Sequence, residues 1–296
     1  MIVYNSCPVC GNQNIYKVLS AKDYTVSGED FEIWECGNCS LRLTQNIPGA
    51  GDIGKYYQSE DYISHSDTKK GFINSLYHSV RKRTLQQKRK LVESYTHKSA
   101  GSILDIGAGT GAFLNTMKIA GWNCTGIEPE ESARNKAKEL YELDLKNAEA
   151  LFTLSPQSFD AITMWHVLEH VHQLQEYIKQ LKHLLKEDGK LFIAVPNYTS
   201  EDAKIYGQYW AAYDVPRHLY HFSPKAMEKL LSEHGLQLET LKPMWFDSVY
   251  VSLLSEKYKT GKSNIIKAFM NGMKSNMKAL GNKSKCSSVI YIALVK

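Results

Sequence analysis

A short apolar run that leads straight into a glycine-rich loop constrains the fold of this chain most. Residues 103–106, with the sequence Ile-Leu-Asp-Ile, are typical of a buried strand, and Gly107, Gly109 and Gly111 follow at once. Glycines permit a tight turn and a close approach of the backbone to a ligand. Residues 112–120 show a helical pattern, so the free amide groups of that helix face back toward the loop. The sequence therefore predicts a strand–loop–helix unit with a ligand above the strand.

The rest of the chain alternates strand-like and helix-like segments. We expect a helix from Phe72 to Tyr95, and further strands and helices at 123–127, 130–141, 159–164, 174–185, 191–195, 236–241 and 288–295. Strands separated by helices imply a parallel sheet that is covered on both faces. Right-handed crossovers make such a sheet doubly wound. Ligands of these sheets bind at the carboxyl ends of the strands.

An acidic residue at the end of the second expected strand complements the glycine loop. Glu128 follows Gly107 by 21 residues, and a carboxylate at this place accepts hydrogen bonds from ribose hydroxyls. A nucleoside site is therefore predicted, against the alternative of a glycine turn that only joins strand and helix. Gly107-x-Gly109-x-x-Ala112 is also a permitted dinucleotide fingerprint, so an NAD-dependent oxidoreductase stays an alternative. Asp105 disfavours it, because a carboxylate there repels a diphosphate and attracts a cationic amino-acid moiety.

Four segments carry a resemblance to a known family. Residues 103–111 resemble motif I of the class I S-adenosylmethionine-dependent methyltransferases, and residues 126–129, 159–171 and 189–197 resemble its acidic loop, fourth strand and fifth strand. The resemblance extends over residues 100–296. It implies an enzyme of α/β class with a doubly wound, mostly parallel seven-stranded sheet, whose last strand is antiparallel and lies between the fifth and sixth.

The same resemblance implies the residues that contact S-adenosylmethionine. Those that line its methionine and ribose parts, its adenine or its flank are Asp105, Gly107, Ala108, Gly109, Gly111, Glu128, Pro129, Ala148, Trp165 and His166. Glu128 is the ribose ligand, and Ala148 lies near adenine. For Trp165, plain packing in the core is an equal alternative.

Two Cys-x-x-Cys pairs lie in the first 60 residues. Cys7 and Cys10 are separated from Cys36 and Cys39 by 25 residues, a spacing that predicts a structural Zn²⁺ with four thiolate ligands. Two disulfides are the alternative, which a reducing compartment disfavours. This segment resembles the N-terminal zinc-binding domain of some sugar C-methyltransferases and related bacterial methyltransferases. We expect a zinc ribbon at 1–60, a helical connector at 61–98 and the methyltransferase domain at 99–296.

A long polar and aromatic loop precedes the expected helix at Ser223. It holds Tyr206, Tyr209, Trp210, Tyr213, Asp214, Arg217, His218, Tyr220 and His221. Its place at the carboxyl edge of the sheet predicts an acceptor site, with His218 or His221 as general base and His166 and His170 as competing bases. Asp214 could orient a histidine, and Arg217 could hold an anion. A structural role is the alternative for each histidine taken singly.

The expected acceptor is a small molecule. The zinc-domain resemblance suggests a nucleotide-linked sugar or another glycan or metabolite intermediate, and the sequence does not distinguish O-, N- and C-methylation. A zinc-ribbon nucleic-acid-binding protein or an RNA methyltransferase is the remaining alternative, because basic residues cluster at 81–90. We expect that cluster to lie on a solvated helix face.

Charge and hydropathy constrain partners and location. The net charge is +5, and residues 261–296 hold seven lysines and no acidic residue. This lysine-rich end includes Ile266, Phe269, Met270 and Met273 at helical spacing, a pattern that fits packing on the domain, a dimer interface or an anionic membrane. We favour packing. The sequence has no apolar run of membrane-spanning length and no signal-peptide pattern, which leads us to expect a cytoplasmic protein.

Overall fold

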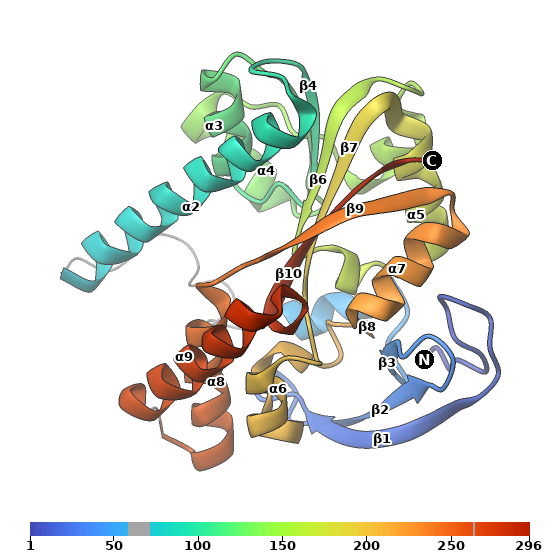
Figure 1. The fold of residues 1–296 in the computed structure, drawn as a ribbon, viewed down its shortest axis with the longest axis vertical. Helices are drawn as coiled ribbons and strands as arrows, with labels where there is room; N and C mark the ends of the chain where they lie inside the picture. The colour runs from blue at the N-terminus through green and yellow to red at the C-terminus, as the bar shows by residue number, and fades with distance from the viewer. Residues whose placement is uncertain (59–71, 263) are drawn as a thin grey trace.

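The chain folds around two sheets (Figure 1). The computed structural model describes residues 1–58, 72–262 and 264–296, with side chains of the first helix described from residue 83. Residues 59–71, which include the start of the expected connector at 61–98, are outside the described residues. The larger sheet has the order β5-β4-β6-β7-β10-β9. Its strands are β4 (Ser102–Ile106), β5 (Asn123–Ile127), β6 (Phe159–Trp165), β7 (Leu185–Pro196), β9 (Leu236–Pro243) and β10 (Ser288–Val295).

The strand directions match the expected topology. β4 runs parallel to β5 and β6, and β6 runs parallel to β7. β10 is antiparallel to both of its neighbours, β7 and β9. The expected last strand between the fifth and sixth is therefore confirmed. Among the described residues this sheet has six strands rather than seven, since the outer position beside β5 is reduced to a single parallel bridge from Ile127 to Lys146. A short, charged edge of this kind does not invite pairing with another chain.

Helices cover both faces of the larger sheet. α2 (Phe72–Thr96), α3 (Ala112–Ile119) and α4 (Glu131–Tyr141) lie on one face, where Val92, Phe113 and Met117 pack on Ile103 and Phe192. α5 (Leu174–Leu184) and α7 (Pro224–Glu233) lie on the other. Successive strand residues point to opposite faces, and the central strands are mainly apolar on both faces, so each layer of helices has its own core.

The smaller sheet is antiparallel and combines two distant parts of the chain. β1 (Ile15–Lys22), β2 (Asp30–Cys36) and β3 (Arg42–Thr44) come from the N-terminal segment. The fourth strand, β8 (Tyr220–His221), comes from the polar and aromatic loop that follows β7. Arg42 pairs with His221 and Leu43 with Tyr220. The N-terminal sheet, blue in Figure 1, is thus directly hydrogen-bonded to the expected acceptor loop.

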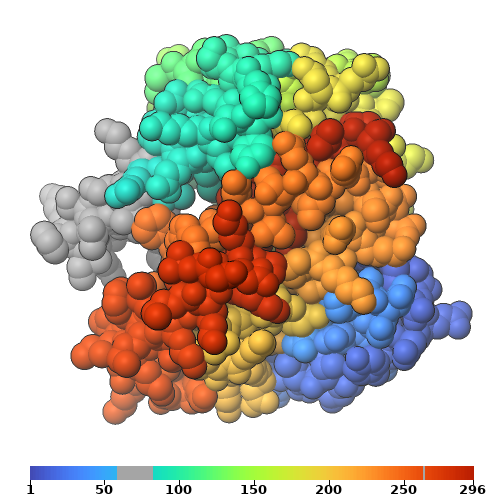
Figure 2. Space-filling model, viewed as in Figure 1, coloured from blue at the N-terminus to red at the C-terminus, as the bar shows by residue number. Residues whose placement is uncertain are grey.

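The remaining elements are short turns of helix and one helical pair. The turns are η1 (Ile53–Tyr57), η2 (Ala148–Thr153), η3 (Leu168–His170), α6 (Glu201–Tyr206), η4 (Gly207–Tyr209), η5 (Ala211–Tyr213) and η6 (Lys283–Lys285). α8 (Asp247–Thr260) and α9 (Ile265–Gly281) lie between β9 and β10 and form the lower left lobe of the face in Figure 2. Among the residues that the structure describes, no helix has both the length and the apolar character needed to cross a membrane.

Candidate functional site

The glycine loop after β4 forms a tight turn beside open space. Gly107, Gly109 and Gly111 all have a positive φ, between +54° and +79°, which other residues rarely adopt. A Cβ on Gly107 would lie 2.4 Å from Val167 Cγ2, whereas a Cβ on Gly109 would meet no atom within 4 Å. The loop therefore needs glycine at 107 to pack on the chain that leaves β6, and at 109 it faces a free volume.

Glu128 lies directly against this loop. Its Oε2 accepts a hydrogen bond from the Gly109 amide at 2.8 Å, and its Oε1 accepts one from the Glu130 amide at 3.0 Å. The amides of Gly107 and Ala108 donate to the carbonyl of Ile127 at 2.8 and 3.0 Å. The ends of β4 and β5 are thereby joined, and a carboxylate is held at the loop.

Asp105 forms the buried floor of the same site. Its Oδ1 accepts a 2.6 Å hydrogen bond from Thr163 Oγ1 on β6. Burial raises the pKa of Asp105 to about 7, with the Glu128 charge acting in the same direction and the Thr163 hydrogen bond and Lys88 opposing it. A second cation near Asp105 would favour the ionised carboxylate.

Lys88 of α2 points into this acidic region. Its Nζ lies 4.2 Å from the centre of the Trp165 ring, a cation–π distance. Burial lowers the pKa of Lys88, while the charges of Asp105 and Asp247 oppose that effect. The prediction that the basic cluster at 81–90 lies on a solvated helix face is therefore wrong for Lys88. The Trp165 ring also packs edge-on against Phe113, and its Nε1 is buried without a hydrogen-bond partner among the described residues.

The predicted cofactor residues come from neighbouring strand ends. Asp105, Gly107, Ala108, Gly109, Gly111, Glu128 and Pro129 gather where β4 and β5 end, Trp165 and His166 stand at the end of β6, and Ala148 opens η2. The segment that leads to Ala148 is tied to β5 by the amide of Glu128, which donates to the carbonyl of Lys146 at 2.9 Å. Lys88, Thr163 and Asp247 are neighbours that the sequence did not indicate.

His166 is held between two carboxylates. Its Nε2 lies 3.0 Å from Asp247 Oδ2, and its Nδ1 lies 3.4 Å from Glu169 Oε1. Burial favours the neutral ring, but the two carboxylates outweigh it and raise the pKa of His166 to about 10. The ring is therefore a cation at neutral pH. It can stabilise negative charge, but it is a poor candidate for a general base.

His218 lies in a cluster with His170 and Glu169. One ligand atom from each of these three residues lies within 4.8 Å of the others. The Nδ1 of His218 is 2.9 Å from the carbonyl of Ala212. Because a carbonyl only accepts, Nδ1 carries a proton, and in the neutral form of the ring Nε2 is the nitrogen with the lone pair. Nε2 lies 3.9 Å from Asp214 Oδ2.

The two neighbours of His218 differ in charge. Burial, together with the His218 charge, lowers the pKa of His170 to about 4, so this ring is neutral. Glu169 is fully buried, and its histidine neighbours hold its pKa below the ordinary value against the opposing effect of burial. The cluster therefore pairs a carboxylate with a histidine nitrogen that is free to accept a proton. It also offers the ligand types of a divalent cation.

His221 and Arg217 are occupied in the contact between the two sheets. His221 Nε2 lies 3.1 Å from Thr44 Oγ1, and burial holds its pKa well below the ordinary value. The Arg217 guanidinium is buried, donates to the carbonyl of Tyr56 at 2.7 Å, and pairs with Asp23 and Asp214 at 3.1 and 2.6 Å. These contacts favour structural roles over a base at His221 or an anion site at Arg217.

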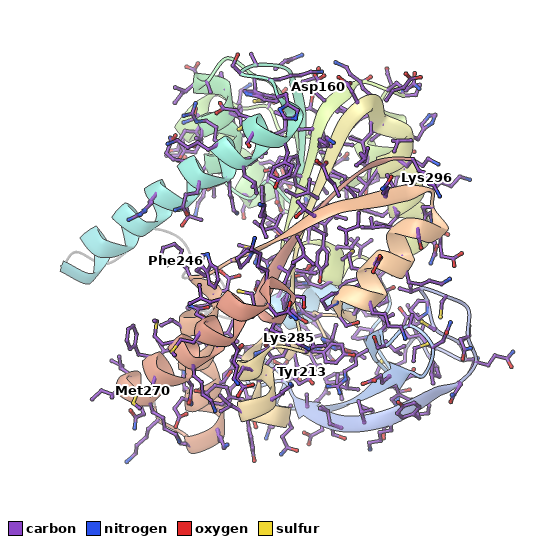
Figure 3. The ribbon with its side chains drawn as sticks, in the orientation of Figure 1. Asp160, Tyr213, Phe246, Met270, Lys285 and Lys296 are labelled. Carbon is purple, nitrogen blue, oxygen red and sulfur yellow. The ribbon has the colours of Figure 1, made fainter. Side chains whose placement is uncertain are left out.

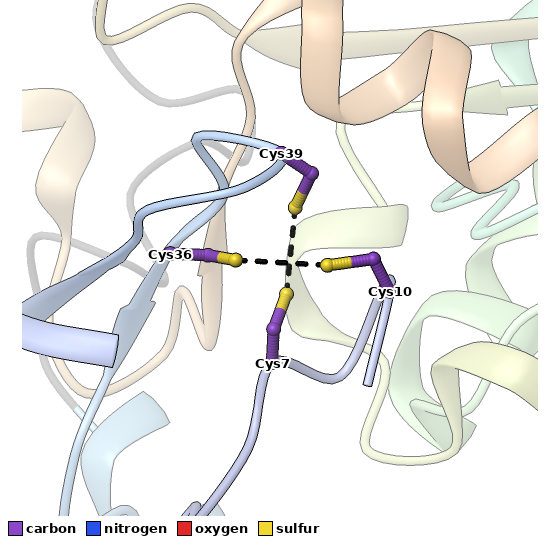
Figure 4. A group of neighbouring side chains, drawn as sticks. All are labelled: Cys7, Cys10, Cys36 and Cys39. Carbon is purple, nitrogen blue, oxygen red and sulfur yellow. Dashed lines mark hydrogen bonds between the residues drawn. The ribbon is translucent and has the colours of Figure 1, made fainter. Parts of the chain in front are cut away.

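The four N-terminal cysteines point at one centre (Figure 4). Cys7 Sγ lies 3.4 Å from Cys39 Sγ, and Cys10 Sγ lies 3.6 Å from Cys36 Sγ, with all four sulfurs within 4.8 Å of one another. A tetrahedron with Zn–S bonds of ~2.3 Å has sulfurs ~3.8 Å apart. The cysteines are free thiols rather than disulfides, and their arrangement fits a four-thiolate metal site.

Comparison with known proteins identifies the family. Residues 77–241 match the model of the methyltransferase domain family. This chain belongs to that family. The matched range begins in α2 and ends in β9. It holds the glycine loop, Glu128, the end of β6 and the polar and aromatic loop before α7, while the cysteine segment and the α8–α9 pair lie outside it.

Curated relatives of this methyltransferase-family chain match it over part of their length. An uncharacterized methyltransferase of Bacillus mycoides (strain KBAB4) is 30% identical over 117 residues, which is 38% of this chain and 55% of the relative. The ubiquinone biosynthesis O-methyltransferase of Xanthomonas euvesicatoria pv. vesicatoria (strain 85-10) is 29% identical over 161 residues, 49% of this chain and 66% of the relative. The chain thus spans about half to two thirds of these relatives.

Two solved structures share the fold. Magnesium protoporphyrin IX methyltransferase from Synechocystis PCC 6803, with bound S-adenosylhomocysteine, has a TM-score of 0.54 at 13% identity and covers 84% of this chain and 100% of its own. The 1,6-didemethyltoxoflavin-N1-methyltransferase of Burkholderia thailandensis, with bound 1,6-didemethyltoxoflavin and S-adenosylhomocysteine, has a TM-score of 0.51 at 11% identity. The match covers 93% of this chain and 100% of that enzyme. At these identities the likeness shows the fold alone.

Proposed function

We propose that this chain transfers a methyl group from S-adenosylmethionine to a small-molecule acceptor. The observation that carries the proposal is the pair of carboxylates around the open glycine loop, Asp105 below it and Glu128 beside it. A cationic sulfonium cofactor would meet complementary charge at Asp105, whereas the same carboxylate would repel the diphosphate of NAD. Glu128 suits the ribose of either cofactor. The NAD-dependent alternative is therefore disfavoured, and membership in the methyltransferase domain family agrees.

The chain's own residues account for the binding of such a cofactor. Glu128 now accepts a hydrogen bond from the Gly109 amide and would turn to the two ribose hydroxyls. Asp105 and the face of Trp165 already attract a cation, Lys88, and offer the same attraction to the amino-acid part of the cofactor. When bound, S-adenosylmethionine supplies an activated methyl group, so the protein has to align an acceptor and remove one proton.

His218 is the base that the geometry favours. Its Nδ1 proton is fixed on the carbonyl of Ala212, which leaves Nε2 to accept a proton from the acceptor. The Glu169 carboxylate beside it would stabilise the imidazolium that forms. The His166 cation, the first residue after β6, would stabilise negative charge on the acceptor.

We further propose that the four cysteines bind a structural Zn²⁺. Four thiolates leave no coordination position for water, so the metal would hold the chain without taking part in the reaction. The division into a zinc ribbon at 1–60, a connector at 61–98 and a methyltransferase domain at 99–296 belongs to this proposal. The likeness of the cysteine segment to the zinc domain of sugar C-methyltransferases favours a nucleotide-linked sugar or a related intermediate as acceptor.

Calorimetric titration with S-adenosylhomocysteine, with NADH in parallel, tests the cofactor. We expect micromolar binding of S-adenosylhomocysteine and none of NADH. Glu128→Ala removes the ribose ligand and should weaken binding about 10- to 100-fold, and Asp105→Ala should weaken it as well. Asp144→Ala is the matched control, since this carboxylate is exposed, and should leave binding unchanged.

The outcomes separate the candidate functions. If the wild type does not bind S-adenosylhomocysteine, the methyltransferase proposal fails. Binding of NADH instead would support the oxidoreductase. If neither ligand binds, nucleic-acid titrations at two salt concentrations test the zinc-ribbon alternative, which predicts a steep loss of affinity with salt.

A further inference from the structure

α9 packs on its neighbours through a row of small residues. Ala268, Gly272, Ser275 and Ala279 are the residues of α9 that are buried, and they recur every three or four positions. A Cβ on Gly272 would lie 2.8 Å from the Cα of Val249 on α8, so the two helices touch backbone to backbone. Ser275 Oγ also donates to Asp202 Oδ1 at 2.6 Å. These close contacts fix the rotation of α9 about its axis.

The fixed rotation turns the large apolar side chains of α9 outward. Seven of them are between 41% and 75% exposed: Ile265, Ile266, Phe269, Met270, Met273, Met277 and Leu280. We call this set the outer face of α9. Figure 3 shows Met270 at the end of the lobe and Phe246, at the start of α8, on the side of it. The expectation that these side chains pack on their own domain is therefore wrong.

Lysines follow one edge of the outer face. On an α-helix, Lys267, Lys274 and Lys278 project on one side, next to the arc of Met270 and Met277. Lys267 and Lys274 pair with Glu256 and Glu201, on neighbouring helices. No residue from 261 to 296 is acidic, and seven are lysine. A broad apolar arc with a lysine edge is the pattern of helices that lie in a membrane interface.

We propose that the outer face of α9 docks on the surface of an anionic lipid bilayer. The apolar side chains would enter the boundary between headgroups and acyl chains, and the lysines would stay at the level of the phosphates. A second copy of this chain fits the face less well. A two-fold contact brings identical surfaces together, so it would set one lysine edge against another. Glu256 and Glu201, the partners of Lys267 and Lys274, would offset only part of that repulsion.

The location of this face connects it to the candidate site. Asp247 begins α8 and contacts His166, while its neighbour Phe246 is exposed beside the lobe. Docking through α9 would therefore hold the α8 end of the site near the lipid surface. The inference itself needs no methyl transfer, so it stands apart from the proposed function.

Vesicle co-sedimentation of the full, zinc-loaded chain tests the proposal. We expect binding to vesicles of phosphatidylcholine with phosphatidylglycerol, and far less to phosphatidylcholine alone. Phe269→Glu with Met270→Glu should reduce the bound fraction on anionic vesicles about tenfold or more, because charges replace two exposed apolar side chains that would enter the bilayer. Ile119→Glu with Leu140→Glu is the matched control, since these side chains are equally exposed on α3 and α4, and it should bind as the wild type does.

Sedimentation velocity of the same proteins without lipid completes the test. A monomer that binds anionic vesicles and loses binding only in the α9 variant supports the proposal. A wild type that stays off anionic vesicles overturns it, and equal loss in the control pair does so too. A dimer that the α9 variant alone converts to monomer, with no vesicle binding, assigns the face to a second copy instead. Titration with S-adenosylhomocysteine should be the same for all three proteins.

Discussion

Replacing Arg217 by methionine should destabilise the fold more than any surface charge change. The guanidinium is 1% exposed and donates to four partners in two different parts of the chain. These partners are Asp214 in the loop before α7, and Asp23, the hydroxyl of Thr25 and the carbonyl of Tyr56 in the N-terminal segment. Methionine has a similar length and no charge. The variant would therefore leave both carboxylates in place without their cation.

The magnitude follows from the surroundings of the two carboxylates. The side chain of Asp214 is 21% exposed and can recover water, whereas that of Asp23 is 0% exposed. Removing one partner of a buried ion pair costs ~3–5 kcal/mol. Asp23 keeps hydrogen bonds from Thr25 and Ser27, so the lower end applies. We expect a loss of ~3 kcal/mol in the free energy of unfolding at pH 7.

Urea denaturation followed by circular dichroism measures this loss. The control is Arg89→Met, which breaks a half-exposed pair with Glu93 on α2 and should cost at most ~0.5 kcal/mol. A loss below ~1 kcal/mol for Arg217→Met would refute the reasoning, because the buried charge would then not matter. Arg217→Lys should recover only part of the lost stability, since one ammonium group cannot reach all of the partners of the guanidinium.

The pH dependence supplies a second check on the same variant. Although burial opposes it, hydrogen bonds from Ser27 and Thr25 and the Arg217 charge lower the pKa of Asp23 to about 2. A carboxyl with a lowered pKa contributes stability above its unfolded pKa and loses it as pH falls through the folded one. The difference in the free energy of unfolding between wild type and Arg217→Met should therefore have its full size at pH 7 and decrease from pH 4 toward pH 2. A difference that stays constant over this range would contradict the ionic explanation.

Two further predictions concern the metal and the charged histidine. Elemental analysis should find about one zinc per chain. The metal should be lost in Cys36→Ser and kept in Cys124→Ser, whose thiol lies on β5 away from the cluster. Retention of zinc in Cys36→Ser would exclude the four-cysteine site. His166, with a pKa raised from 6.5 to about 10, contributes stability that is complete below pH 6.5 and lost as pH rises to 10. His166→Gln should abolish that slope in urea titrations, and an unchanged slope would assign it to another group.

The layout of the larger sheet could be predicted because it is encoded locally. The apolar strands, the glycine loop and the amphipathic helices can each be recognised within about ten residues. The doubly wound arrangement follows from handedness rules, and the place of the antiparallel last strand follows from the family resemblance. The four cysteines were readable for the same reason, since their spacing alone indicates convergence on one metal. The family resemblance implies seven strands, but the outer position beside β5 holds only the bridge between Ile127 and Lys146. The family pattern therefore fails where a segment is short and charged.

Contacts between distant segments were not readable in this way. Nothing near Arg217 in the sequence indicates Asp23, which lies 194 residues away, so an anion site was the natural interpretation. Lys88 stands in a basic run, and only the rotation of α2 turns it toward Asp105 and Trp165. The rotation of α9 is a similar case. Small residues at helical spacing allow two helices to approach closely, so the row of Ala268, Gly272, Ser275 and Ala279 is the sequence signal for the buried side of α9. The large apolar residues on the opposite side indicated the wrong face.

The pairing of β3 with β8 gives the N-terminal sheet a reason to be present. The hydroxyl of Thr44, at the end of β3, donates a hydrogen bond to the carbonyl of His218 at 2.7 Å, and the amide of Thr44 donates one to the carbonyl of Leu219 at 3.0 Å. The loop that carries His218 is thus fixed from two sides, by the exit of β6 through Glu169 and by the N-terminal sheet through Thr44. Since Cys36 ends β2 and Cys39 precedes β3, a metal at the cysteines would hold the strand that holds the loop. Such a metal would in this way help to set the position of His218, the proposed base.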